Sequence, residues 1–108
     1  MSDTMRTLYD TVVRRRSERA EGSYTCYLFD KGLDKILKKV GEECAETIIA
    51  AKNGKNEETV GEIADLIYHL TVMMVAQGID IAEVMDELDR RAQKTGNLKQ
   101  MKTVDRNT

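Results

Sequence analysis

The chain has 108 residues, of which 41 % are hydrophobic, and its formal net charge is −2 at pH 7. This length suits a single domain, and the nearly balanced charge excludes nucleic-acid binding driven by bulk electrostatics. Proline is absent, and the aromatic residues are four tyrosines and one phenylalanine, which is typical of helical proteins. We therefore predict one all-α domain over residues 1–108, with flexible termini at residues 1–4 and 98–108.

The cysteine usage and the N-terminus indicate the compartment. Cys26 and Cys44 are the only cysteines, too few for a disulfide framework, and we expect both to be small side chains in or near the core. Residues 1–19 are polar and lack an apolar signal region, and no run approaches the roughly 20 apolar residues of a membrane span. We expect a cytoplasmic protein with neither a membrane nor a nucleic-acid partner.

The first predicted helix spans about residues 5–20. Leu8, Val12 and Val13 lie on one side of it, and an arginine-rich stretch at residues 14–19 forms its C-terminal end, where the helix dipole favours cations. These arginines form either a phosphate-binding patch or the solvated end of a helix, and the sequence favours the second interpretation.

Residues 21–32 break the helical pattern. Gly22 opens the segment, Gly32 closes it, and strand and turn formers fill residues 23–29, where three of the aromatic residues occur. We predict an apolar loop laid against the helices. Because loops on rigid scaffolds often carry binding groups, this loop is either a substrate contact or a packed connector.

The second helix, residues 33–52, carries both an apolar stripe and a run of glutamates. Glu43 lies at the edge of the stripe, whereas Glu42 and Glu46 point away from it. On an arbitrary helix, a solvated face would explain these acids, with lysines 38 and 39 paired to the glutamates four residues later. The helical spacing predicts a buried stripe of Leu33, Ile36, Leu37, Val40, Cys44, Ile48 and Ala51.

The third helix, residues 57–77, is apolar nearly all round between residues 66 and 76, and such a helix must be buried on every side. Four helices of this size cannot wrap it, which indicates a subunit interface, most simply in a two-fold homodimer. Glu62 and Asp65 precede this part, and acids drawn toward an interior need a partner. His69, the one histidine, is expected to be structural or to pair with a carboxylate. The predicted buried stripe comprises Val60, Ile63, Ala64, Ile67, Leu70, Thr71 and Met74.

A fourth helix is predicted at about residues 81–94. Gly78 is suited to end the third helix, and Asp80 with Glu83 has the form of a capping box that begins the fourth.

The acidic pairs of the second and third helices are equally distant from Gly54, in a predicted turn at residues 53–56. If the helices fold back antiparallel there, both pairs lie about 14 Å from the turn at the same height. Their carboxylates then repel one another unless a cation lies among them. Oxygen ligands suit Mg²⁺, and neither the Glu-x-x-His pairs of a di-iron bundle nor a glycine-rich phosphate loop occurs.

Mg²⁺ at such a cluster would perform phosphate chemistry. Two ions would bridge a polyphosphate, neutralise its charge and lower the pKa of a bound water, and a spare glutamate would accept the proton. Phosphate recognition would be helped by lysines 31, 35, 38 and 39 or by the arginines.

These residues match a known family pattern. Glu42-Glu43-x-x-Glu46 followed by Glu62-x-x-Asp65 resembles the EExxE…ExxD signature of the all-α, MazG-type nucleotide pyrophosphohydrolases. The Ser-Tyr-Thr run at residues 23–25 and the Lys-Lys-Val-Gly-Glu-Glu run at residues 38–43 narrow the resemblance to the phosphoribosyl-ATP pyrophosphohydrolase family, over about residues 8–97.

The resemblance implies a four-to-five-helix MazG-like bundle assembled as a homodimer. It implies Mg²⁺-dependent hydrolysis of phosphoribosyl-ATP to phosphoribosyl-AMP and pyrophosphate, the second step of histidine biosynthesis. The metal ligands would be Glu43, Glu46, Glu62 and Asp65, and Glu42 would be a ligand or the general base, so that the candidate catalytic residues are Glu42, Glu43 and Glu46. The candidate substrate-binding residues are Ser23, Tyr24, Thr25, Lys35 and Lys39.

Two alternatives stay open from the sequence. The first is a house-cleaning nucleoside triphosphate pyrophosphatase of the same fold, and the second is a non-catalytic helical dimerisation module whose acids are surface residues. The chain shows no second domain with the Cys/His metal set of the next enzyme of the pathway, so we expect the unfused form.

Overall fold

The structure, a computed structural model, describes residues 2–94, so the predicted flexibility of residues 98–108 lies outside it. Five helices and no strand occur in this range, which confirms the all-α prediction. Their bounds are α1 (Ser2–Ser17), α2 (Tyr24–Lys31), α3 (Leu33–Lys52), α4 (Asn56–Gln77) and α5 (Ile81–Ala92). Helix α1 begins three residues before its predicted start at residue 5, and α5 ends two residues before its predicted end.

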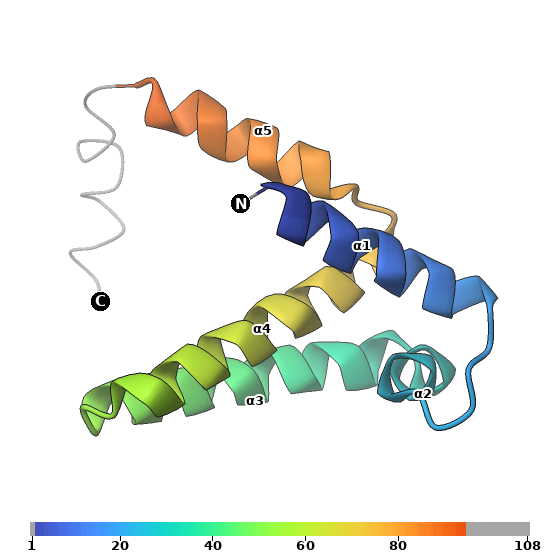
Figure 1. The fold of residues 1–108 in the computed structure, drawn as a ribbon, viewed down its shortest axis with the longest axis horizontal. Coiled ribbons are helices and arrows are strands. Elements are labelled where there is room, and N and C mark those ends of the chain that lie inside the picture. Colours follow the sequence, from blue (N-terminus) through green and yellow to red (C-terminus); the bar gives the residue numbers. More distant parts are fainter. Residues whose placement is uncertain (1, 95–108) are drawn as a thin grey trace.

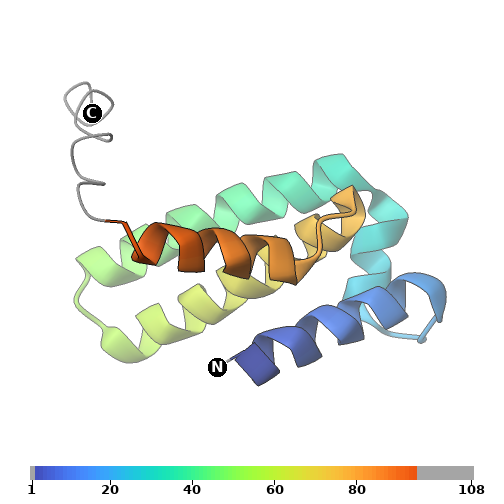
Figure 2. The same ribbon diagram turned by 90° about the horizontal axis from the view of Figure 1, so that it is seen from above.

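An antiparallel hairpin of α3 and α4 is the base of the fold (Figure 1). Helix α1 packs on α4, α5 runs back along α1, and the short α2 packs against α1 and α3 (Figure 2). Gly54, with φ of +73° in the left-handed region, forms the hairpin turn where the sequence predicts it, because glycine enters this region without a steric penalty.

The hydrophobic core lies where all five helices meet, toward the C-terminal end of α4. It is formed by buried side chains from every helix: Tyr9, Val12, Leu28, Ile36, Val72, Met74, Val75 and Ile81. The Tyr9 hydroxyl donates a hydrogen bond of 2.8 Å to the carbonyl of Ile79, which joins α1 to the segment between α4 and α5. Asp80 and Glu83 form the predicted capping box at the start of α5.

The prediction of a loop at residues 21–32 is wrong for most of the segment, which forms α2. Ser23 is its N-cap, because its hydroxyl accepts a hydrogen bond from the backbone N–H of Cys26 at 3.2 Å. Cys26 and Leu28 are buried against the core. Burial of these apolar side chains outweighs the strand preference of the sequence, since propensity is a weak determinant.

The predicted apolar stripe of α3 does not face the core. Only Ile36 of that set is buried, whereas Leu37, Cys44 and Ile48 are exposed, so the core position predicted for Cys44 is wrong. The side chains that α3 buries are Ile36, Glu43 and Ala50, spaced seven residues apart along one edge of the helix. The apolar stripe is consequently left on the outer surface of the hairpin.

Helix α4 also exposes apolar side chains that its composition predicts to be buried. The chain folds over its C-terminal half, but Val60, Ile63 and Ile67 of its predicted stripe are exposed. Among the described residues α4 is the one helix long and apolar enough, by length and composition, to cross a membrane, and 28 % of that window is buried. The expectation that no run approaches the length of a membrane span is therefore wrong for α4. Because α4 packs along both α3 and α1, we interpret it as a core helix with an uncovered side.

Candidate metal centre

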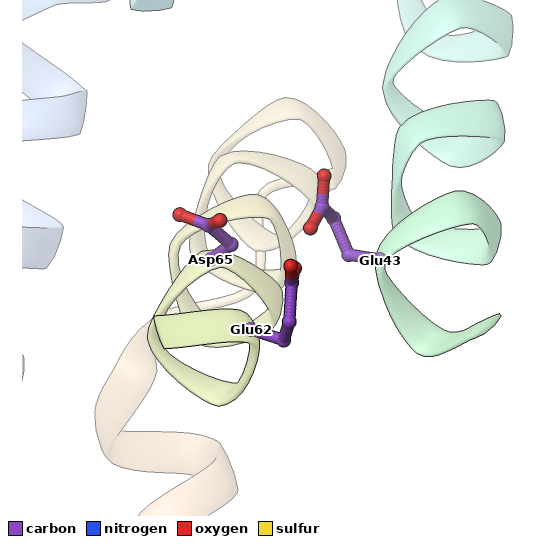
Figure 3. A group of neighbouring side chains, drawn as sticks. All are labelled: Glu43, Glu62 and Asp65. Carbon is purple, nitrogen blue, oxygen red and sulfur yellow. The ribbon is translucent and has the colours of Figure 1, made fainter. Parts of the chain in front are cut away.

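Three carboxylates meet between α3 and α4. Glu43 projects from α3 toward α4, which supplies Glu62 and Asp65 (Figure 3). One ligand oxygen from each of the three lies within 4.8 Å of the other two. The hairpin therefore brings together acids that lie at equal distances from the Gly54 turn, as the spacing in the sequence predicts.

The local environment of this cluster disfavours three bare negative charges. Glu43 is 6 % exposed, and Oε1 of Glu43 and Oε1 of Glu62 are buried without a hydrogen-bond partner among the described residues. Burial raises the pKa of Glu62, and the nearby charges of Glu46, Glu43 and Asp65 raise it further. Buried carboxylate oxygens need a compensating partner, and a set made of oxygens alone fits a hard divalent cation.

Lys39 supplies one positive charge at the edge of the cluster. Its Nζ lies 3.2 Å from a carboxylate oxygen of Glu42 and 3.7 Å from one of Glu43. The hydrogen bond between Lys39 and Glu42 holds the pKa of Glu42 below its usual value and raises the pKa of Lys39. The expected pair of Lys38 with Glu42 is not formed among the described ion pairs, and Lys39 takes its place.

Glu46 lies next to the cluster but outside the group of three. Its side chain is exposed, yet its charge is the second-largest cause of the raised pKa of Glu62. Lys35 is half-buried on the same helix, and its charge helps to lower the pKa of Glu42. Thus the α3 acids and lysines named from the sequence share one surface around Glu43.

The Ser-Tyr-Thr run at residues 23–25 begins α2, and each hydroxyl has a partner within the chain. Ser23 caps α2, the Tyr24 hydroxyl lies 3.0 Å from Nε2 of His69, and Thr25 is hydrogen-bonded to the Tyr68 hydroxyl. Tyr24 is close enough to the carboxylates for Glu43 to help raise its pKa, after the larger effect of burial. The segment therefore borders the acidic cluster.

Sequence reasoning missed the contribution of Tyr68 and left His69 without a defined partner. His69 is 5 % exposed, and its Nδ1 lies 2.7 Å from the backbone carbonyl of Asp65. A tyrosine and a histidine three and four residues after Asp65 were the available signal, but their partners on α2 are about 45 residues away in sequence.

Two arginines at and just after the C-terminal end of α1 form hydrogen bonds to other helices. Arg16 donates to the carbonyl of Val75 at 2.8 Å, and Arg19 donates two hydrogen bonds to Asp30, at 2.5 and 2.7 Å. The first contact joins α1 to α4, and the second joins the segment after α1 to α2. They favour a structural role for both arginines over a phosphate-binding patch.

Comparisons with known proteins identify the family to which the chain is similar. A family model described as phosphoribosyl-ATP pyrophosphohydrolase matches residues 5–92. A phosphoribosyl-ATP pyrophosphatase from Pelotomaculum thermopropionicum is 52 % identical over 92 residues, covering 85 % of this chain and 94 % of the relative. One from Listeria welshimeri is 50 % identical over 98 residues, covering 91 % and 94 %. The histidine biosynthesis bifunctional protein HisIE of Caldanaerobacter subterraneus is 49 % identical over 92 residues, covering 85 % of this chain and 45 % of that protein.

Proposed function

The chain belongs to the phosphoribosyl-ATP pyrophosphohydrolase family. We propose that Glu43, Glu62 and Asp65 bind the divalent cation required for its hydrolysis reaction. The chain is a hydrolase of histidine biosynthesis that acts on phosphoribosyl-ATP. Water is added across the phosphoanhydride that joins the two terminal phosphates to the rest of the substrate. The products are phosphoribosyl-AMP and pyrophosphate, and this substrate distinguishes the chain from a house-cleaning pyrophosphatase.

The observation that carries the metal assignment is the pair of buried carboxylate oxygens without partners, on Glu43 and Glu62. One carboxylate oxygen from each of Glu43, Glu62 and Asp65 lies within 4.8 Å of the other two, which suits one small cation, and Mg²⁺ binds through a few carboxylates together with substrate phosphates. When bound, Mg²⁺ would withdraw negative charge from the phosphoanhydride and so ease attack by water. Glu46, also named from the sequence, lies outside this group of three, but its charge contributes to the raised pKa of Glu62.

We assign proton acceptance from the attacking water to Glu46. This carboxylate is exposed to solvent, and no described cation forms an ion pair with it. Glu42 was the other candidate, but its hydrogen bond to Lys39 lowers its pKa and so weakens it as a base. In this assignment Glu42 orients Lys39, and Glu43 both binds the cation and shares that lysine.

The substrate phosphates are assigned to Lys35 and Lys39, which lie on the same surface of α3 as the acids. Ser23, Tyr24 and Thr25 form the facing border of the site. The Ser23 hydroxyl accepts the Cys26 N–H in capping α2 and also lies within hydrogen-bond reach of the Cys26 thiol; we propose that its hydrogen turns to a phosphate oxygen when substrate binds. The Tyr24 side chain is partly exposed, so its ring offers a surface to the substrate even though its hydroxyl is engaged.

The enzyme is proposed to act as a cytoplasmic homodimer. Support comes from the large apolar side chains exposed on both helices of the hairpin, namely Leu37, Ile48, Ile49, Val60, Ile63 and Ile67. Exposed apolar side chains gathered on the two helices of the hairpin mark an interface, and a second copy offers an identical surface to pair with them. Four acids lie in the N-terminal half of α4, which favours a protein partner over a lipid one.

Thermal unfolding with and without Mg²⁺ tests the metal assignment separately from catalysis. A ligand at 100 times its dissociation constant adds about 2.7 kcal/mol to stability, so Mg²⁺ should raise the melting temperature of the wild type. Glu43→Gln should abolish this increase. Glu58→Gln, which removes an exposed acid of α4 paired with Lys55 at 3.8 Å, should leave it intact. An equal Mg²⁺ response in both variants would contradict the assignment.

Catalysis is tested by pyrophosphate release from phosphoribosyl-ATP, compared with release from free nucleoside triphosphates. We expect Mg²⁺-dependent release from phosphoribosyl-ATP and a much lower kcat/KM for the free nucleotides, which lack the second phosphoribosyl group. A preference for free nucleotides would support the house-cleaning activity instead.

A further inference from the structure

His69 contacts both the start of α2 and the turn of α4 that carries Asp65. Its Nδ1 is 2.7 Å from the backbone carbonyl of Asp65, and a carbonyl can only accept a hydrogen bond, so Nδ1 carries the hydrogen. In the neutral ring Nε2 is then an acceptor, and the Tyr24 hydroxyl, 3.0 Å away, donates to it. One buried ring therefore connects the helix turn that bears Asp65 with the first residue of α2.

A second hydrogen bond runs parallel to the first. Thr25 follows Tyr24 at the start of α2 and is hydrogen-bonded to the hydroxyl of Tyr68, which precedes His69 on α4. The Tyr68 and His69 rings meet edge to face with centroids 4.9 Å apart, and Tyr24 meets His69 in the same way at 5.7 Å. Two adjacent residues of α2 are thus joined to two adjacent residues of α4.

Helix α2 needs such a directional contact. It is eight residues long, and it is flanked by Gly22 and Gly32, whose φ values are +79° and +96°. Because glycine adopts many backbone conformations with little penalty, these two residues do not by themselves fix the direction of the helix. Its buried side chains, Cys26 and Leu28, hold it against the core, but apolar burial is non-directional. Hydrogen bonds have strict geometry. Those between Arg19 and Asp30 hold the C-terminal end of α2, and those of Tyr24 with His69 and of Thr25 with Tyr68 set how far its start lies from the carboxylates.

We propose that His69 is a positioning residue, which acts through the Tyr24 hydroxyl to hold the substrate-binding start of α2 at a fixed distance from the cation ligands on α4. This inference rests on the proposed function, since it assigns the consequence of the contact to that same site. It gives the Tyr24 hydroxyl a role in placing substrate rather than in touching it. It also predicts a specific form of the ring, with the hydrogen on Nδ1.

The kinetic test compares two tyrosines that stack on each other with ring centroids 5.9 Å apart. Tyr24→Phe removes only the hydroxyl that contacts His69, and we expect it to lower kcat/KM for phosphoribosyl-ATP about five- to tenfold, the equivalent of one hydrogen bond, mainly through a higher KM. Tyr27→Phe is the matched control, because the Tyr27 hydroxyl has no hydrogen bond with any described residue. Equal kinetics for the two variants would overturn the proposal.

Substitutions of His69 separate positioning from simple packing. His69→Gln places an amide oxygen near the position of Nε2, so KM should stay within about twofold of the wild type. His69→Asn reaches the Asp65 carbonyl but not Tyr24, so it should match Tyr24→Phe, and the double variant should be no worse than either single one. If His69 only filled space, both variants would change the melting temperature while leaving KM and kcat of the folded enzyme unchanged, and that result would overturn the proposal.

A spectroscopic measurement tests the geometry without turnover. Because His69 is the only histidine, a ¹⁵N-labelled sample gives a single imidazole pattern, which should show the Nδ1–H form in the wild type and in Tyr27→Phe. An Nε2–H ring would overturn the proposed contact. If the wild type has this ring form but releases no pyrophosphate, the proposed function is overturned and with it this role of His69. If the wild type is active and Tyr24→Phe has the same kcat/KM, only the role of His69 is overturned.

Discussion

At the scale of single residues, the site is governed by how one lysine is shared among several carboxylates. Lys39 contacts both Glu42 and Glu43, and its closer contact is with Glu42. Among the described residues Glu62 forms no ion pair, and its pKa is raised by burial and by its acidic neighbours. Glu42 is therefore the carboxylate whose charge Lys39 compensates most, whereas one buried oxygen each of Glu43 and Glu62 has no partner among the described residues, and a cation is required between them.

This unequal compensation predicts different effects for two glutamates separated by one helical turn. Glu46→Gln should lower kcat for pyrophosphate release by about 100-fold or more, because general-base catalysis contributes at least that factor. Glu42→Gln should lower it less than about tenfold, since the pKa of Glu42 is already lowered by Lys39. Steady-state kinetics at saturating Mg²⁺ measures both. The opposite order would assign proton acceptance to Glu42.

The raised pKa of Glu62 predicts a pH-dependent stability of the metal-free protein. Because the folded state favours the protonated acid, its contribution is complete below the usual pKa of 4.5 and is lost as the pH rises through the raised value. Glu62→Gln should therefore unfold at a higher temperature than the wild type at pH 7 in EDTA, and at nearly the same temperature below pH 4.5. A difference that is constant across this pH range would show that charge on Glu62 is not its cause.

At the scale of helices, much of the arrangement is predictable because it depends on local signals. The bounds of α3 follow from its helical pattern, and the position of the turn follows from Gly54. The symmetry of the acids about that turn predicts that Glu43, Glu62 and Asp65 meet. Helix α2 was not predictable in this way, because the residues that stabilise it, Leu28 above all, gain their burial from helices distant in sequence.

The N-cap of α2 provides a test of this account. Ser23→Ala removes the hydroxyl that accepts from Cys26 and should lower the free energy of unfolding by about 1 kcal/mol. Ser23→Asn restores a capping acceptor and should recover most of that loss. Urea unfolding followed by circular dichroism measures both. If the two variants are equally destabilised, the serine contributes through a contact other than the cap.

At the scale of the whole molecule, the chain buries one end of its hairpin and leaves the other end apolar and exposed. The core lies at the C-terminal part of α4, whereas Ile48, Ile49 and Val60 near the turn are 68, 59 and 66 % exposed. The sequence predicted that residues 66–76 of α4 would need cover from a second chain, whereas this chain itself covers all of that stretch but Ile67 and leaves Val60 and Ile63 of the N-terminal half exposed. It did not predict that α3 would turn its stripe outward too, because periodicity identifies an apolar face without identifying what covers it.

This exposed surface predicts a dimer that depends on the turn-proximal half of the hairpin. Ile48→Asp or Val60→Asp places a charge in the proposed interface, where burial without a partner is costly, so light scattering should report the mass of one chain instead of two. Leu88→Asp is the control, because Leu88 is 54 % exposed on α5, outside this surface, and this variant should stay dimeric. Dissociation in the control, or dimers in all three variants, would place the interface elsewhere. Because α3 and α4 carry both the apolar surface and the acids, the dissociated variants should also bind Mg²⁺ more weakly in the thermal assay, since the helices that hold its ligands lose their outer support.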